Sequence, residues 1–167
     1  MEQHDNPAVK IRPIRLEDAE QVNELRRHPA VMSYTMSLPS ERISENQKRI
    51  ESFGENDHIF VAEVNGRVVG VVGLHVGSGK ERHVGAIGIM VHGDFQGQSI
   101  GRALMETVLD LADNYLMLVR TWLIVLAENH KAIHLYESLG FKIEGTLSKS
   151  IIVGGQYVDS HFMARLR

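Results

Sequence analysis

The stretch from Ile87 to Leu104 constrains the fold more than any other part of the sequence. It begins as a short apolar run, continues through small and polar residues, and ends with the spacing of an amphipathic helix. The free N–H groups at the start of such a helix point outward and carry the positive end of its dipole. Because small residues let a phosphate approach the backbone, the pattern predicts a strand, a phosphate-binding turn and a helix.

This turn fits neither of two common nucleotide-binding patterns. It lacks Gly-Lys-Ser and Gly-Lys-Thr, so it is not a Walker loop. A dinucleotide fingerprint needs Gly-x-Gly-x-x-Gly inside a strand–helix–strand unit, whereas the strands before this turn are expected to be joined as hairpins. The glycines alone would also fit a plain flexible turn, but strand, turn and helix together favour phosphate binding.

The rest of the chain alternates between segments typical of strands and of helices. Pro13 limits the first strand to a sheet edge, Asp18 can cap the first helix, Pro29 ends it, and Pro39-Ser40 starts the second helix. The predicted strands are 9–15, 59–64, 68–76, 84–91, 122–126, 141–152 and 157–165, and the predicted helices are 18–27, 39–53, 100–115 and 130–139. Because Trp122–Leu126 is continuously apolar, we expect a central strand buried on both faces.

The order of elements, β-α-α-β-β-β-α-β-α-β-β, predicts an α+β fold. We expect one mixed, mostly antiparallel central sheet with helices on both faces. The chain has 167 residues and shows no internal repeat and no dividing linker, which indicates a single domain over 1–167.

Composition excludes several functional classes. The net charge of -3 provides no basic field for a general nucleic-acid binder. The absence of cysteine excludes disulfides, thiolate metal sites and a cysteine nucleophile. No run approaches the ~20 apolar residues of a membrane span, and the polar start, Met1–Ala8, shows no signal peptide. We therefore expect a cytoplasmic protein.

A second informative segment runs from Asn129 to Phe141. Asn129 stands where a strand gives way to a helix, so its amide can bind a ligand or cap the helix. Ala132, Leu135 and Tyr136 share one face of that helix. Taken alone, a capping asparagine and a core tyrosine are the simpler interpretations.

Together the two segments resemble the GNAT superfamily of N-acetyltransferases. The stretch from Gln96 to Gly101 is similar to the family's acyl-CoA loop, Gln/Arg-x-x-Gly-x-Gly/Ala, with Ser99 where the first glycine is usual. A serine suits that position at negative φ and would be strained at positive φ. Asn129–Phe141 match the family's Asn-x-x-Ala-x-x-Leu-Tyr-x-x-x-Gly-Phe throughout.

Within the superfamily, the chain looks most like the bacterial L-amino-acid N-acetyltransferase and phosphinothricin acetyltransferase branch. The features that carry this resemblance are Asp113-Asn114-Tyr115, residues 141–146 and the last hairpin, residues 155–165. Spermidine and ribosomal-protein acetyltransferases share much of the same tail.

The resemblance implies acetyl-CoA as the acetyl donor, bound where the fourth and fifth strands splay apart. Its pantetheine arm would pair with the fourth strand and with Asn129, and its pyrophosphate would rest on the N–H groups of residues 98–102. Arg102 or Lys131 would meet a further phosphate. The cofactor-binding residues implied in this way are Ile89, Met90, Val91, Gln96, Gly97, Gln98, Ser99, Ile100, Gly101, Arg102, Asn129 and Ala132.

The resemblance also implies direct attack of a neutral amine on the thioester. A backbone N–H near Met90 would stabilise the oxyanion, and Tyr136 would be the general acid toward the departing thiolate. The general base stays open between His75, His83, Glu63 and a water chain, because the glutamate that many relatives carry on the fourth strand is absent here. The loop 30–38 and the final hairpin would wall the amine side.

We expect the acceptor to be the primary amine of a small molecule, an L-amino acid or analogue, with a polyamine or a protein N-terminus as alternatives. A homodimer is possible, because relatives often dimerise through the sheet edge or the last strands. A non-catalytic acyl-CoA-binding sensor is an alternative of another class. A metal hydrolase is disfavoured, because His130 and His134 lack the glutamate of His-Glu-x-x-His between them, and we expect no metal.

Overall fold

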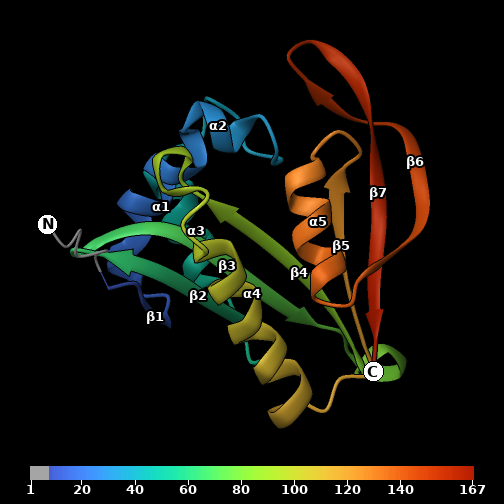
Figure 1. Ribbon diagram of the computed structural model, residues 1–167. Coiled ribbons are helices and arrows are strands. Elements are labelled where there is room, and N and C mark those ends of the chain that lie inside the picture. Colours follow the sequence, from blue (N-terminus) through green and yellow to red (C-terminus); the bar gives the residue numbers. More distant parts are fainter. Residues whose placement is uncertain (1–7) are drawn as a thin grey trace, which may run out of the picture.

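The computed structural model describes residues 8–167, and its centre is a seven-stranded sheet in the order β1-β2-β3-β4-β5-β7-β6 (Figure 1). Within these residues β4 and β5 pair in parallel and all other neighbouring strands are antiparallel. The predicted α+β fold with a mostly antiparallel sheet is therefore confirmed. The strands are β1 (Lys10–Pro13), β2 (Asp57–Val64), β3 (Arg67–Val76), β4 (Val84–Val91), β5 (Arg120–Leu126), β6 (Lys142–Val153) and β7 (Gln156–Leu166). The polar start, apart from residue 8, lies outside the described residues.

Five α-helices and several short helical turns accompany the sheet in residues 8–167. The helices are α1 (Ala19–Arg27), α2 (Pro29–Met32), α3 (Ile43–Glu51), α4 (Ile100–Asp110) and α5 (His130–Ser138). Single 3-10 turns are η1 (Leu16–Asp18), η2 (Gly79–Glu81) and η3 (Gly93–Phe95), and the π-helical η4 (Leu111–Tyr115) continues α4. In the described part of the chain, no helix has the length and apolar character needed to cross a membrane.

Helices cover both faces of the sheet, as predicted. Successive side chains of a strand point to opposite faces. Accordingly, Val72 and Leu74 of β3 belong to the core cluster that includes α4 and α5, whereas Val71 belongs to the smaller cluster with Val22 and Leu25 of α1. The sheet therefore separates two apolar cores, and a site between its strands has an α4–α5 side and an α1–α2 side.

The side chain of Asp18 does not cap α1, so that prediction is wrong. The Asp18 carboxylate accepts two hydrogen bonds from the Arg12 guanidinium, both at 2.8 Å, and a third from the N–H of Arg15 at 2.8 Å. Asp18 is 4% exposed, and its pKa is lowered by these hydrogen bonds against an opposing effect of burial. A nearby buried cation outcompetes the helix start for this carboxylate, so Asp18 fastens β1 to η1.

Two helix boundaries also differ from the prediction. Pro29 ends α1 but also begins α2, whose first turn is capped by the His28 side chain. Helix α3 begins at Ile43 and not at Pro39, because Glu45 accepts the backbone N–H of Arg42 at 2.9 Å and closes a capping box there.

The fifth strand is buried along one face, whereas on the other face only Leu126 is buried, which corrects the expectation that residues 122–126 are buried on both faces. Leu123 and Val125 are buried in the α4–α5 core, but Ile124 is 42% exposed. The reason lies in the pairing of β4 with β5, which covers only Val84–Ala86 and Arg120–Trp122. Beyond these residues the two strands spread apart, as Figure 1 shows, and the side chain of Ile124 faces open space between them.

Candidate active site

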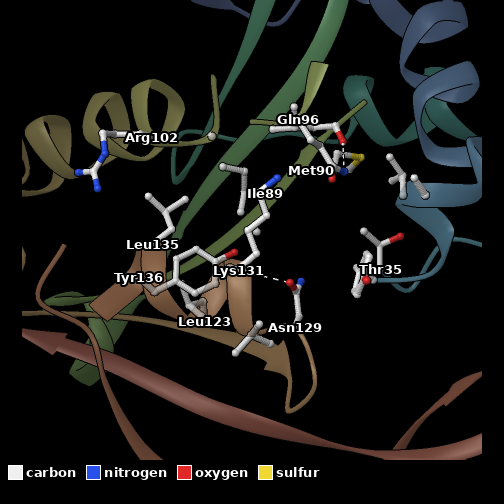
Figure 2. A pocket seen from close by; sticks show the side chains of 18 of the residues that line it. Thr35, Ile89, Met90, Gln96, Arg102, Leu123, Asn129, Lys131, Leu135 and Tyr136 are labelled. Atoms are coloured by element: carbon white, nitrogen blue, oxygen red, sulfur yellow. Dashed lines mark hydrogen bonds between the residues drawn. The ribbon is translucent and has the colours of Figure 1, made fainter. Parts of the chain in front are cut away.

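A cleft of about 440 Å³ opens where β4 and β5 diverge (Figure 2). It contains Tyr136 and all the predicted cofactor-binding residues except Gln98 and Ile100. Gln98 donates from its side-chain amide to the carbonyl of Asp94, and Ile100 is 1% exposed in the core beneath the turn. The lining residues are Ala30, Val31, Tyr34, Thr35, Ile87, Gly88, Ile89, Met90, Val91, Phe95, Gln96, Gly97, Ser99, Gly101, Arg102, Leu123, Ile124, Val125, Asn129, Lys131, Ala132, Leu135 and Tyr136.

The turn before α4 presents free backbone N–H groups. Gly97 has φ 78° and Ser99 has φ 63°, both in the left-handed region. In the described chain, the N–H groups of Gly97, Gln98 and Ser99 have no hydrogen-bond acceptor, and the first N–H groups of α4 have none within the helix. Ser99 therefore has the positive φ at which a serine is strained. The free N–H groups and the positive end of the α4 dipole favour the binding of an anion at this turn.

The direction of the backbone along β4 narrows the choice of backbone N–H groups near Met90. The N–H of His92 donates to the carbonyl of Val69 at 2.8 Å, toward β3. Because N–H groups alternate in direction along a strand, the N–H of Met90 also points toward β3, in register with Val71. The N–H groups of Ile89 and Val91 therefore point into the split, and they are the candidate donors among the N–H groups near Met90.

The side chains around the turn hold it in place. Gln96 donates from Nε2 to the carbonyl of Val91 at 3.1 Å, which ties the turn to the end of β4. Asn129 accepts the N–H of Ala132 at 3.3 Å and so caps α5, which leaves its amide NH2 free to donate to a ligand. Both roles that the sequence allowed for Asn129 are therefore compatible.

Tyr136 sits at the wall of the cleft and is 7% exposed. Its ring lies 6.1 Å from that of Phe141, and Figure 2 shows its hydroxyl pointing toward the middle of the cleft. Burial raises the pKa of Tyr136 to about 12. The phenol therefore keeps its proton at neutral pH, which is the state that a hydrogen-bond donor needs.

None of the three side chains considered as a general base lines the cleft. His75 bonds through Nδ1 to Asp57 at 2.6 Å, and Glu63 accepts from Arg12 at 2.8 Å. His83 lies just before β4, at the closed end of the β4–β5 pair. Among residues 8–167 the cleft lining contains no carboxylate and no imidazole, so water is the remaining candidate from the sequence.

A smaller hollow of about 210 Å³ adjoins the cleft at Tyr34. Its walls come from the loop after α2 and from the β6–β7 hairpin, the two segments predicted to wall the amine side. Sequence reasoning missed its two acidic residues, Glu128 and Asp159, although Glu128 directly precedes Asn129. The hollow is lined by Ser33, Tyr34, Leu126, Glu128, Val153, Val158 and Asp159.

One group of metal-ligating side chains occurs in the described chain, formed by His28, His92 and Asp94. Its geometry does not suit a cation. Nδ1 of His28 accepts the N–H of Ala30 at 3.3 Å, and Nδ1 of His92 accepts the N–H of Asp94 at 3.2 Å. The guanidinium of Arg67 lies 3.3 Å from Nε2 of His92. His130 and His134, weighed in the sequence, are not part of this group.

A mostly antiparallel sheet that splits beside a turn with free N–H groups, with a protonated tyrosine in the split, is consistent with the predicted class of acyltransferase. Residues 19–141 match the model of the acetyltransferase (GNAT) family. This match covers more than half of the chain, which therefore belongs to the GNAT family. The predicted family and the predicted class of enzyme are confirmed.

Relatives with known activities span nearly the whole chain. The L-amino acid N-acetyltransferase AaaT of Escherichia coli is 31% identical over 160 residues, which cover 95% of this chain and 98% of the relative. The spermidine N(1)-acetyltransferase of the same organism is 31% identical over 156 residues, 90% of this chain and 81% of the relative. The crystal structure of Vibrio cholerae spermidine N-acetyltransferase with CoA and spermine has a TM-score of 0.84 at 27% identity, covering 95% of each chain.

Proposed function

We propose that this protein transfers the acetyl group of acetyl-CoA to the primary amine of a small molecule, with residues 1–167 acting as one domain. The observation that carries the proposal is the cleft at the β4–β5 split, which joins free backbone N–H groups to a buried, protonated tyrosine. An L-amino acid is the first acceptor class, because an L-amino acid N-acetyltransferase is similar to this chain over nearly its full length.

The residues of the cleft fit the parts of the donor. The N–H groups of Gly97–Ser99 and of the first turn of α4 suit a diphosphate. The N–H groups of Ile89 and Val91 and the amide of Asn129 suit the amides of a pantetheine arm, which would lie along β4 like an added strand. Family members use acetyl-CoA, and a similar solved structure contains CoA.

The chemistry follows from the groups at the split. A neutral amine attacks the thioester carbonyl, and the N–H of Ile89 or Val91 donates to the oxygen that gains charge. Tyr136 donates a hydrogen bond to the departing sulfur. A pKa of about 12, against ~8.5 for a simple thiol, makes complete proton transfer uphill by roughly 5 kcal/mol, so hydrogen bonding without full transfer is favoured. The proton of the amine leaves through water.

A polyamine is the second candidate acceptor. The hollow beside the cleft has two acidic residues, Glu128 and Asp159, and among residues 8–167 its lining includes no cation. A second ammonium group of the acceptor would be attracted there, whereas the carboxylate of an amino acid would be repelled. Spermidine N-acetyltransferases are also similar to this chain.

An amine panel tests the proposal. Purified protein is mixed with acetyl-CoA and with amino acids, spermidine, phosphinothricin-like amines or short peptides, and free thiol is followed with a disulfide dye. The readout is clean because the chain has no cysteine. We expect release of thiol that depends on one amine class. Acetyl-CoA binding without turnover on any amine would instead favour the non-catalytic sensor, and the absence of both would refute the proposal.

We further propose a homodimer through β6. This strand is the edge of the sheet, and its apolar side chains Ile143, Leu147 and Ile152 are 45%, 46% and 67% exposed. An unpaired edge with apolar side chains favours association. Sedimentation of the wild type and of Leu147→Lys tests this, because a dimer through β6 predicts a lower association constant for the variant.

A further inference from the structure

Tyr34 stands at the boundary between the cleft and the smaller hollow. Among residues 8–167 it is the one residue that lines both spaces, which measure about 440 and 210 Å³. The preceding residue, Ser33, lines only the hollow, and the following residue, Thr35, lines only the cleft. The loop after α2 therefore passes from one space to the other at Tyr34.

The end of β5 and the loop before α5 form the opposite side of this boundary. Val125 and Asn129 line the cleft. Leu126 and Glu128 line the hollow. The backbone of this side is fixed, because β5 pairs with β7 up to Leu126 and Asn129 caps α5. The side chain of Tyr34 is therefore the part of the boundary that a substitution can remove.

The loop does not depend on the ring of Tyr34 for its conformation. The backbone N–H of Tyr34 donates to the carbonyl of Val31 at 3.0 Å. Oγ of Ser33 donates to the carbonyl of Pro29 at 2.8 Å, so both bonds fasten the loop to α2. The Tyr34 residue itself is 52% exposed. Truncation of this side chain therefore removes a half-exposed ring and leaves the bonds that hold the loop.

We propose that Tyr34 determines the specificity for the acceptor by closing the cleft from the hollow, so that short amines are used in preference to long ones. This inference rests on the proposed function. An acceptor whose amine lies at the split and whose tail points along the loop meets the ring of Tyr34 before it reaches the hollow. One methylene group in a closed pocket changes specificity by about 10-fold to 200-fold, so a single large ring at this boundary is sufficient. Tyr34 thereby favours an L-amino acid over a polyamine.

Linear acceptors of increasing length test this role. At saturating acetyl-CoA, kcat/KM is measured for primary amines from propylamine to octylamine and for amino acids from L-alanine to L-norleucine. For Tyr34→Ala we expect the ratio of kcat/KM for the longest amine to that for the shortest to rise about tenfold above the wild-type ratio. Tyr34→Phe keeps the ring and should keep the wild-type ratio. Tyr115→Ala, at a 74% exposed tyrosine of η4 that lines neither space, is the matched control.

The acidic residues of the hollow report whether a tail has entered it. In Tyr34→Ala, the diamine with the chain length of octylamine should be a better acceptor than octylamine, because its second ammonium reaches Glu128 and Asp159. Glu128→Gln in the same background should reduce this advantage, and added salt should reduce it as well. In the wild type we expect the monoamine and the diamine to have similar kcat/KM values.

Titration calorimetry of octylamine into protein saturated with CoA gives a readout that needs no turnover. Tighter binding to Tyr34→Ala than to the wild type and Tyr34→Phe supports the role. An unchanged length profile in Tyr34→Ala, the same change in Tyr34→Phe, or a wild type that prefers the long diamine would overturn it. If the wild type neither binds CoA nor acetylates any amine, the proposed function fails, whereas an active wild type with an unchanged Tyr34→Ala overturns the role of Tyr34 alone.

Discussion

The imidazole rings of His28 and His92 lie with their centroids 4.1 Å apart, and each ring caps a different short helix. His28 caps α2, which borders the side of the cleft that we propose takes the amine, and His92 caps η3, which leads from β4 into the turn that we propose binds the donor. The backbone packs closely between them, since a Cβ on Gly93 would lie 2.6 Å from Cε1 of His28. The pair therefore joins the two sides of the site.

The environment of His92 predicts that the folded protein loses stability in mild acid. Burial lowers the pKa of His92, and His28 and Arg67 lower it further, while Asp94 and Glu24 oppose them. A histidine with a lowered pKa in the folded state binds fewer protons than in the unfolded chain. Its contribution therefore destabilises the fold as pH falls below the ordinary value of about 6.5. Urea midpoints between pH 8 and pH 5 measure this effect.

The matched variant for this prediction is His92→Asn, which keeps a hydrogen-bond acceptor near the N–H of Asp94 but does not titrate. We expect a smaller loss of stability between pH 7 and pH 5 than in the wild type. His83→Asn, at an exposed histidine, should keep the wild-type slope. Equal slopes for the wild type and His92→Asn would contradict the prediction.

Tyr136→Phe removes the hydroxyl and keeps the packing against Phe141. If the hydroxyl donates to the departing sulfur, we expect kcat to fall about 10-fold to 100-fold, with little change in the KM for acetyl-CoA. Free-thiol release under saturating donor measures it. Since Tyr136 is buried, Tm must be measured beside the rate, and an unchanged kcat in a folded variant would remove Tyr136 from the reaction.

Ser99→Gly should stabilise the protein. Ser99 has φ 63°, and a left-handed residue other than glycine costs ~1–2 kcal/mol, which exceeds the ~0.5–1 kcal/mol entropic cost of glycine. We expect Tm to rise by about 1–3 °C. Ser78→Gly is the control, because Ser78 has φ -120° and should lose stability. A lower Tm for Ser99→Gly would mean that its backbone is not strained.

Gly88→Ala tests on which side of the β4–β5 split each of the two substrates binds. Gly88 follows Ile87 on β4, so a side chain at position 88 would point away from the α4–α5 core, toward the side of the cleft that we propose takes the amine. A Cβ there meets nothing within 4 Å, so we expect a small gain in Tm together with a rise of about threefold or more in the KM for the amine alone. Gly145→Ala, equally open but outside the cleft, should leave both KM values unchanged. A shift in the KM for acetyl-CoA would place Gly88 on the donor side.

Local patterns predicted the elements that build the site. Apolar periodicity and turn residues act over a few neighbouring positions, and they located β4, the turn at Gln96–Gly101, α4 and α5 to within a few residues. The strand–turn–helix pattern and the Asn129–Phe141 segment also identified the family that the comparisons confirm.

Tertiary structure alone decided which side chains reach the split. The pairing of Asp18 with Arg12, and of Asp113 with Arg165 through two hydrogen bonds at 2.9 and 2.6 Å, joins residues from different elements. His75 and Glu63 pair with Asp57 and Arg12 outside the cleft, whereas Lys131 lines it. The sequence by itself determined the elements and the family, because both depend on local spacing. Long-range packing and the direction of each N–H decided the contents of the site, since they depend on contacts between distant segments.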